Sequence, residues 1–156
     1  MSLPTGQTTP AYLILHTTGF EIGVVAAAFR VENWPESVGF PWGVALVDWV
    51  GDTISSGSIE EGITILPVGD SIPWVPDENG NILIATIYFT VLDPDWIGAE
   101  TILSINDDLH DHFDEPVFLS DVDYHIYGML GDSIFLHTDL WLATATTTFS
   151  ELKALY

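Results

Sequence analysis

The chain has 156 residues, is 47% hydrophobic and contains no cysteine. Only Arg30 and Lys153 are basic, against 23 acidic residues, so the formal net charge is −21. This imbalance argues against nucleic acid and anionic membrane surfaces as partners, because both are bound through lysine and arginine. No apolar run is long enough for a membrane helix, so we expect no membrane insertion.

Turn residues divide the chain into short segments rich in β-branched and aromatic residues, the pattern that predicts strands. Residues 1–10 are rich in Pro, Thr and Gly and are expected to be flexible. Residues 22–31 fit a helix or a strand, and the valines favour a strand; residues 51–57 are expected to form a turn. The segments expected to form strands are 12–16, 22–31, 43–50, 60–68, 82–92, 100–105, 117–120, 122–129, 133–138 and 141–149.

The longest of these segments follows a turn signal, Asp77-Glu78-Asn79-Gly80. From Ala85 to Val91, apolar residues alternate with threonine and tyrosine, which is the period of a half-buried strand. We expect this strand to be the centre of the fold.

A hairpin is expected near the end of the chain. Segments 122–129 and 133–138 flank Leu130-Gly131-Asp132, which would place Tyr127 opposite Phe135 and His125 opposite His137. With His110 and His112, that last pair would form a histidine-rich site, or else two ordinary histidines on an exposed strand.

These strands, with no long amphipathic helix, predict an all-β fold: an antiparallel β-sandwich or jelly roll of about nine to ten strands. The expected organisation is a flexible segment at 1–10, one sandwich domain over 11–149 and a tail at 150–156.

Three stretches carry a resemblance to a known family: Val25–Glu32, Gly80–Val91 and Thr101–Ile105 followed by aspartates. Their order resembles the cohesin-like domain, a β-sandwich of bacterial extracellular assemblies, whereas Asn33-Trp34-Pro35 replaces a Tyr-Asp-Pro common in that family. It implies an extracellular or cell-surface location and a protein partner. The last eight residues are also similar to short C-terminal tails of some secreted bacterial proteins.

The strongest candidate for chemistry is the loop from Asn106 to Glu115. In an extended segment His110 and His112 point to the same side, and the aspartates between and around them supply oxygen ligands. Ca²⁺ is favoured over Zn²⁺ in so acidic a chain, and the alternative is a solvated acidic loop. The candidate metal ligands are Asp107, Asp108, His110, Asp111, His112 and Asp114.

A second candidate is aromatic. Trp34, Trp42 and Trp74 fall in predicted loops, where exposed rings would stack on sugars or contact a protein; the alternative is that they close the ends of the core. Arg30 is one of two possible contacts for an anion.

These features lead to one expectation and two alternatives. The expectation is a non-catalytic extracellular module that binds a protein partner or a polysaccharide, with Ca²⁺ bracing its acidic loop. The first alternative is a structural subunit of a surface fibre or similar assembly, capable of self-assembly by strand addition. The second is a metal-dependent hydrolase, although no nucleophile motif or phosphate-binding loop is present.

Overall fold

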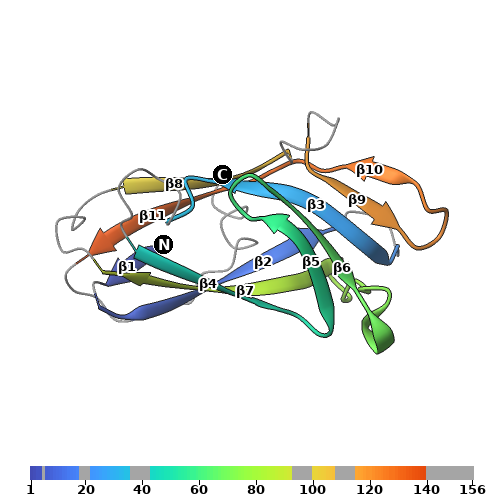
Figure 1. Cartoon of the computed structure of the whole chain (residues 1–156), viewed down its shortest axis with the longest axis horizontal. Coiled ribbons are helices and arrows are strands. Elements are labelled where there is room, and N and C mark those ends of the chain that lie inside the picture. Colours follow the sequence, from blue (N-terminus) through green and yellow to red (C-terminus); the bar gives the residue numbers. More distant parts are fainter. Residues whose placement is uncertain (5, 18–21, 36–42, 93–99, 108–114, 140–156) are drawn as a thin grey trace.

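The computed structural model describes residues 1–4, 6–17, 22–35, 43–92, 100–107 and 115–139. These residues form eleven strands in two sheets packed face to face (Figure 1). The predicted β-sandwich is therefore confirmed, with eleven strands instead of nine or ten. Among the described residues, no helix is long and apolar enough to cross a membrane.

The larger sheet has β3 at its centre. β3 pairs with β6 on one side, and on the other it pairs first with β9 and then with β8. β10 lies beyond β9, and β11 lies between β8 and β1, with the β1 pairing parallel. The bounds are β1 Ser2–Pro4, β3 Val24–Glu32, β5 Thr53–Ser58, β6 Gly62–Pro67, β8 Glu100–Asn106, β9 Val117–Ser120, β10 Ile126–Gly128 and β11 Ser133–Asp139.

The smaller sheet contains β2 (Thr8–His16), β7 (Asn81–Val91) and β4 (Gly43–Trp49), with β7 in the middle. β7 is the long strand expected at the centre of the fold. Its alternation is confirmed, since Ala85, Ile87, Phe89 and Val91 are buried. The turn before it is also confirmed, because the Asp77 carboxylate accepts the backbone N–H groups of Asn79 and Asn81.

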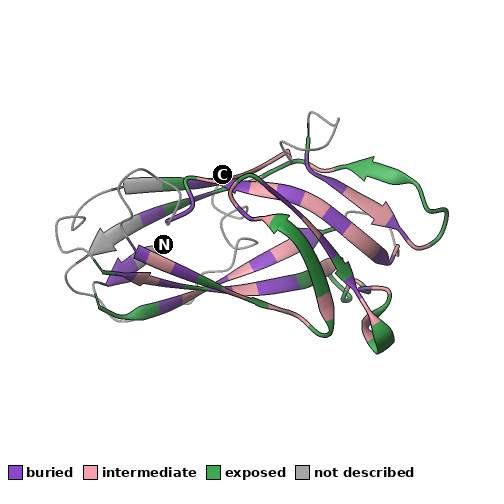
Figure 2. Cartoon of the chain, in the orientation of Figure 1, coloured by how far each residue is buried: buried purple, intermediate pink, exposed green. Residues whose placement is uncertain are grey.

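The core lies between the inner faces of the two sheets. β3 alternates buried and half-buried residues, while β5 and β10 are mostly exposed (Figure 2). Val24 and Val31, near the two ends of β3, are both buried. The side chains buried most deeply in the core include Phe89, Ile65, Ile87, Ile134 and Leu136.

The predicted hairpin is wrong. β10 pairs with β9, placing Tyr127 opposite Phe118, while β11 pairs with β8 and β1. β10 and β11 thus run end to end beside β9 and β8, so Phe135 lies opposite Ile102 and not opposite Tyr127. The local turn signal was outweighed by pairing with strands that come earlier in the chain.

Two further expectations are corrected. The segment expected to be a turn at 51–57 contains most of β5, which pairs along its length with β6. Polar Ser55 and Ser56 do not resemble a half-buried strand, but β5 is an edge strand and needs few apolar residues. In the segment expected to be flexible, Ser2–Pro4 and Thr8–Pro10 belong to strands, and Leu3 is in the core.

Candidate functional site

The predicted metal-binding loop leaves the large sheet after β8 and returns to it at β9. Asp107 is the one candidate ligand that the structure describes; Asp108, His110, Asp111, His112 and Asp114 lie outside the described residues. Asp107 and Glu115, at the two ends of the loop, line one cleft of about 320 Å³. Within the described part of the chain, no three His, Cys, Asp or Glu residues are grouped closely enough to hold a metal ion.

Arg30 stands beside this loop, on the outward side of β3. Its Nε donates a hydrogen bond to the backbone oxygen of Asp107 (2.9 Å). Its guanidinium also forms ion pairs with Glu32 (2.8 Å) and with the Asp107 carboxylate (3.6 Å). The predicted anion contact is therefore engaged by carboxylates of its own chain, and it fixes where the loop leaves β8.

The two described tryptophans of the aromatic candidate are in the core. Trp34 is 2% exposed and packs against Phe89, with ring centroids 6.0 Å apart. Trp74 is 5% exposed, and its backbone exchanges two 2.9 Å hydrogen bonds with Val24. Trp42 lies outside the described residues. In this arrangement Trp34 and Trp74 close the sandwich and present almost no ring face to a sugar.

A weakly charged face covers the outward side of β5, β6, β3, β9 and β10. In these five strands only Arg30 and Glu32 are charged, and they pair with each other. Cross-strand register aligns apolar side chains on this side: Ile126 lies opposite Leu119, Leu119 opposite Ala26, and Leu66 opposite Ile54. We call Ile54, Leu66, Ala26, Leu119 and Ile126 the outer row.

The outer row is accessible to a partner. Ile54 is 58% exposed, Ile126 is 53% exposed and Leu66 is 38% exposed. Between β3 and β6 the pairing ends at Ala27 and Ile65, so Ala26 and Leu66 lie just beyond the last pair. Apolar side chains held in water over five adjacent strands are a feature of interaction surfaces.

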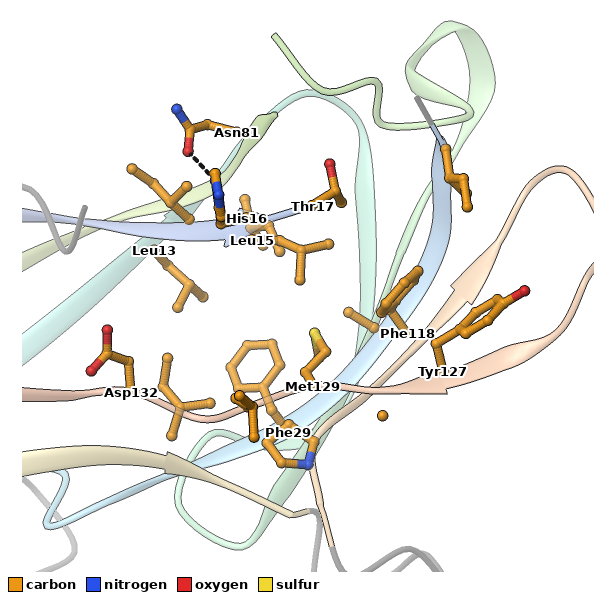
Figure 3. A pocket seen from close by; sticks show the side chains of 18 of the residues that line it. Leu13, Leu15, His16, Thr17, Phe29, Asn81, Phe118, Tyr127, Met129 and Asp132 are labelled. Carbon is orange, nitrogen blue, oxygen red and sulfur yellow. Dashed lines mark hydrogen bonds between the residues drawn. The ribbon is translucent and has the colours of Figure 1, made fainter. Parts of the chain in front are cut away.

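A second feature lies between the sheets. A cavity of about 640 Å³ opens where β2, at the edge of the small sheet, faces β3, β9 and β10 (Figure 3). Leu13 and Leu15 project into it from β2, and Phe29 and Met129 face them from the other wall. We call this space the inter-sheet cavity.

Polar groups stand around the rim of the cavity. His16 and Asn81 are joined by a 2.9 Å hydrogen bond, and Asp132 lies on the opposite wall (Figure 3). Tyr127 stacks on Phe118, with ring centroids 5.4 Å apart, and its hydroxyl donates to Asp123 (2.6 Å). This hydrogen bond raises the pKa of Tyr127.

Neither the outer row nor the cavity was found from the sequence. Alternation within a strand, such as β3, predicts which residues share one face of that strand. A row of side chains across several strands also requires the register in which the strands pair. The cavity depends on which strands of two different sheets lie opposite each other, and no local pattern carries that information.

Comparison with known proteins places the chain in no group: no family model, curated protein or solved structure matches it. The class that the fold itself defines is a two-sheet β-sandwich. The resemblance to cohesin-like domains stays a prediction.

Proposed function

We propose that the protein is a non-catalytic, extracellular binding module that docks a protein partner on the outward side of its large sheet. The observation that carries the proposal is the outer row: apolar side chains on five adjacent strands, on a face where Arg30 and Glu32 neutralise each other. An apolar centre with few charges is the composition of protein interface cores.

The charge of the chain adds to this argument. The chain has a net charge of −21, so most of its surface repels acidic molecules. The outer row contains no charged side chain, so this repulsion is weaker there at short distance. A partner with basic residues around an apolar patch would be attracted from a distance and then pack on the row. Burial of Trp34 and Trp74 favours a protein over a polysaccharide as the partner.

The proposal also includes a calcium ion at the loop between β8 and β9. Asp107 and Glu115 converge on one cleft, together with Asn106 and Ser104, and such oxygen groups are the ligands that Ca²⁺ prefers. The ion would join the two ends of the loop beside the outer row. Zn²⁺ and the metal-dependent hydrolase remain the alternative, since they require His110 and His112.

The test uses matched charge substitutions on the two sides of the sandwich. Leu119→Asp and Ile54→Asp place a carboxylate in the outer row, whereas Leu46→Asp places one on the outward side of the small sheet. Leu46 is 65% exposed and Ile54 is 58% exposed, so Leu46→Asp and Ile54→Asp should disturb folding equally little.

Each variant is immobilised and exposed to an extract of the source cells, and captured proteins are identified by mass spectrometry and then purified for calorimetry. We expect the wild type and Leu46→Asp to bind one partner with equal affinity. Leu119→Asp and Ile54→Asp should weaken that binding by at least about tenfold, because a charge would be buried without a counter-ion. Equal affinity of all four proteins would contradict the proposal.

A structural subunit of a surface assembly is the second candidate. β10 favours it, since in the described part of the chain this strand pairs with β9 and with no other strand, and all three of its residues are exposed. An exposed strand edge is a template for strand addition from another chain. Sedimentation over a hundredfold range of protein concentration distinguishes these two hypotheses. A structural subunit should form larger species as the concentration rises, and a binding module should remain a monomer.

A further inference from the structure

We propose that the inter-sheet cavity is a binding site for a small uncharged amphiphile, a molecule with an aliphatic chain and a hydroxyl or amide head group. This site is separate from the outer row. Phe118 lines the cavity, while its neighbour Leu119 belongs to the outer row, so the two sites lie on opposite sides of β9.

The floor of the cavity is apolar. It is formed by Leu13, Leu15, Phe29 and Ile84, each at most 9% exposed. The more exposed walls add Phe118 and Met129, and methionine adapts its shape to different apolar ligands. A volume of about 640 Å³ falls in the range of known small-molecule sites, which is about 300–1,000 Å³.

Leu130 adds an exposed apolar side chain to the lining of the cavity. It lies at the rim and is 95% exposed, although it adjoins an apolar space. A ligand in the cavity would cover part of this side chain and of the stacked Phe118 and Tyr127 rings. Removing that area from water would stabilise the complex by about 25 cal/mol for each Å².

The polar residues at the rim of the cavity determine which head group a ligand can have. Among the described lining residues there is no lysine or arginine, and the one carboxylate is Asp132. The side chain of Arg30 is held on the other side of β3 by Asp107 and Glu32. A fatty acid or phosphate head group would be repelled by the Asp132 carboxylate, whereas a hydroxyl or amide can form hydrogen bonds with His16, Asn81 and Asp132.

The experiment uses the full chain and the fluorescent probe N-phenyl-1-naphthylamine, which is uncharged and brightens in apolar surroundings. We expect the probe to bind at one site per chain. Decanol should displace it at a concentration at least about tenfold lower than decanoate does at neutral pH, where the carboxyl group of decanoate is ionised.

Two variants locate the site. Phe118→Asp places a charge in the cavity and should weaken probe binding by at least about tenfold. Leu130→Asp alters an exposed side chain that folding does not require, and it should weaken binding severalfold. Leu119→Asp is the matched control, since it lies one residue away on the other side of β9 and should leave the affinity for the probe unchanged.

Several results would overturn the proposal. They are absence of probe binding, equal displacement by decanol and decanoate, or binding that neither Phe118→Asp nor Leu130→Asp affects. Because Leu119→Asp tests the outer row and Phe118→Asp tests the cavity, failure of either proposal is recognised independently.

Discussion

At the scale of single residues, Asp123 is an exposed acid whose carboxylate is held by several hydrogen bonds. Its carboxylate accepts hydrogen bonds from the Ser120 hydroxyl, the Tyr127 hydroxyl and the backbone N–H of His125. The bond from Ser120 contributes most, followed by that from Tyr127, and together they lower the pKa of Asp123 to about 2. This carboxylate thereby joins β9 to the start of β10.

Asp123 should make the free energy of unfolding depend on pH in the acidic range. Since its pKa is lower in the folded chain than its ordinary value of about 4, the ionised group stabilises the fold at neutral pH. That contribution is lost as the pH falls from about 4 to about 2. Urea unfolding of the wild type and Asp123→Asn should therefore show a stability difference that is constant above about pH 4 and shrinks below it.

The control for this prediction is Asp70→Asn, which removes one exposed carboxylate in the short 3-10 helix η1, Gly69–Ser71. If Asp70→Asn reproduced the pH profile of Asp123→Asn, the effect would come from overall charge and not from the hydrogen bonds of Asp123.

Trp34 provides a second prediction at this scale. It is 2% exposed and contacts Phe89 near the end of β7, so Trp34→Ala should leave a cavity in the core. We expect a loss of about 3–5 kcal/mol in the free energy of unfolding, measured with urea. Phe135→Ala removes an aromatic ring that is 50% exposed and should cost clearly less. A Trp34→Ala variant as stable as the wild type would contradict the role in the core described above.

At the scale of elements, the turn that leads into β7 is held by Asp77 and Gly80. The Asp77 carboxylate accepts two backbone N–H groups, and the hydrogen bond from Asn81 is the main reason that the pKa of Asp77 is lowered. Gly80 has a φ of +80°, and a Cβ there would lie 2.5 Å from the backbone oxygen of Thr17. The turn thus needs glycine for its backbone conformation and for a close approach to the end of β2.

These two requirements can be separated by comparison with Gly6. Gly6 has a similar φ of +73°, but a Cβ there would meet nothing within 4 Å. Gly6→Ala should cost about 1 kcal/mol for the backbone conformation alone. Gly80→Ala should cost more, since the backbone of Thr17 would have to move as well. Equal losses in thermal or urea unfolding would show that the contact with Thr17 is unimportant.

At the scale of the whole molecule, the net charge of −21 is the dominant property. Mutual repulsion of acidic side chains opposes the compact state, and salt screens it. We expect the midpoint of thermal unfolding, followed by tryptophan fluorescence, to rise as NaCl is added. A midpoint that is independent of NaCl would contradict this expectation.

If the loop between β8 and β9 binds Ca²⁺, the ion should stabilise the fold by more than charge screening alone does. At matched ionic strength, Ca²⁺ should raise the unfolding midpoint further than NaCl does, and EDTA should reverse the increase, because an ion that binds only the folded state stabilises it by mass action. Replacing Asp111 and Asp114 by asparagine should abolish the Ca²⁺-specific part. If Zn²⁺ gave the larger shift, and His110→Ala removed it, the hydrolase alternative would be favoured.

The sequence by itself determined which segments form most strands and which of their faces are buried, as Ala85–Val91 shows, because a period of two is a local property of the chain. It also determined the charge and the partners that the charge disfavours. Only the tertiary structure decided that residues 126–128 pair with β9 and not with β11, that Trp34 and Trp74 are enclosed, and that a cavity remains between the sheets. Pairing and enclosure depend on residues far apart in the chain, and their relative stability is set by packing across both sheets, which no short pattern encodes.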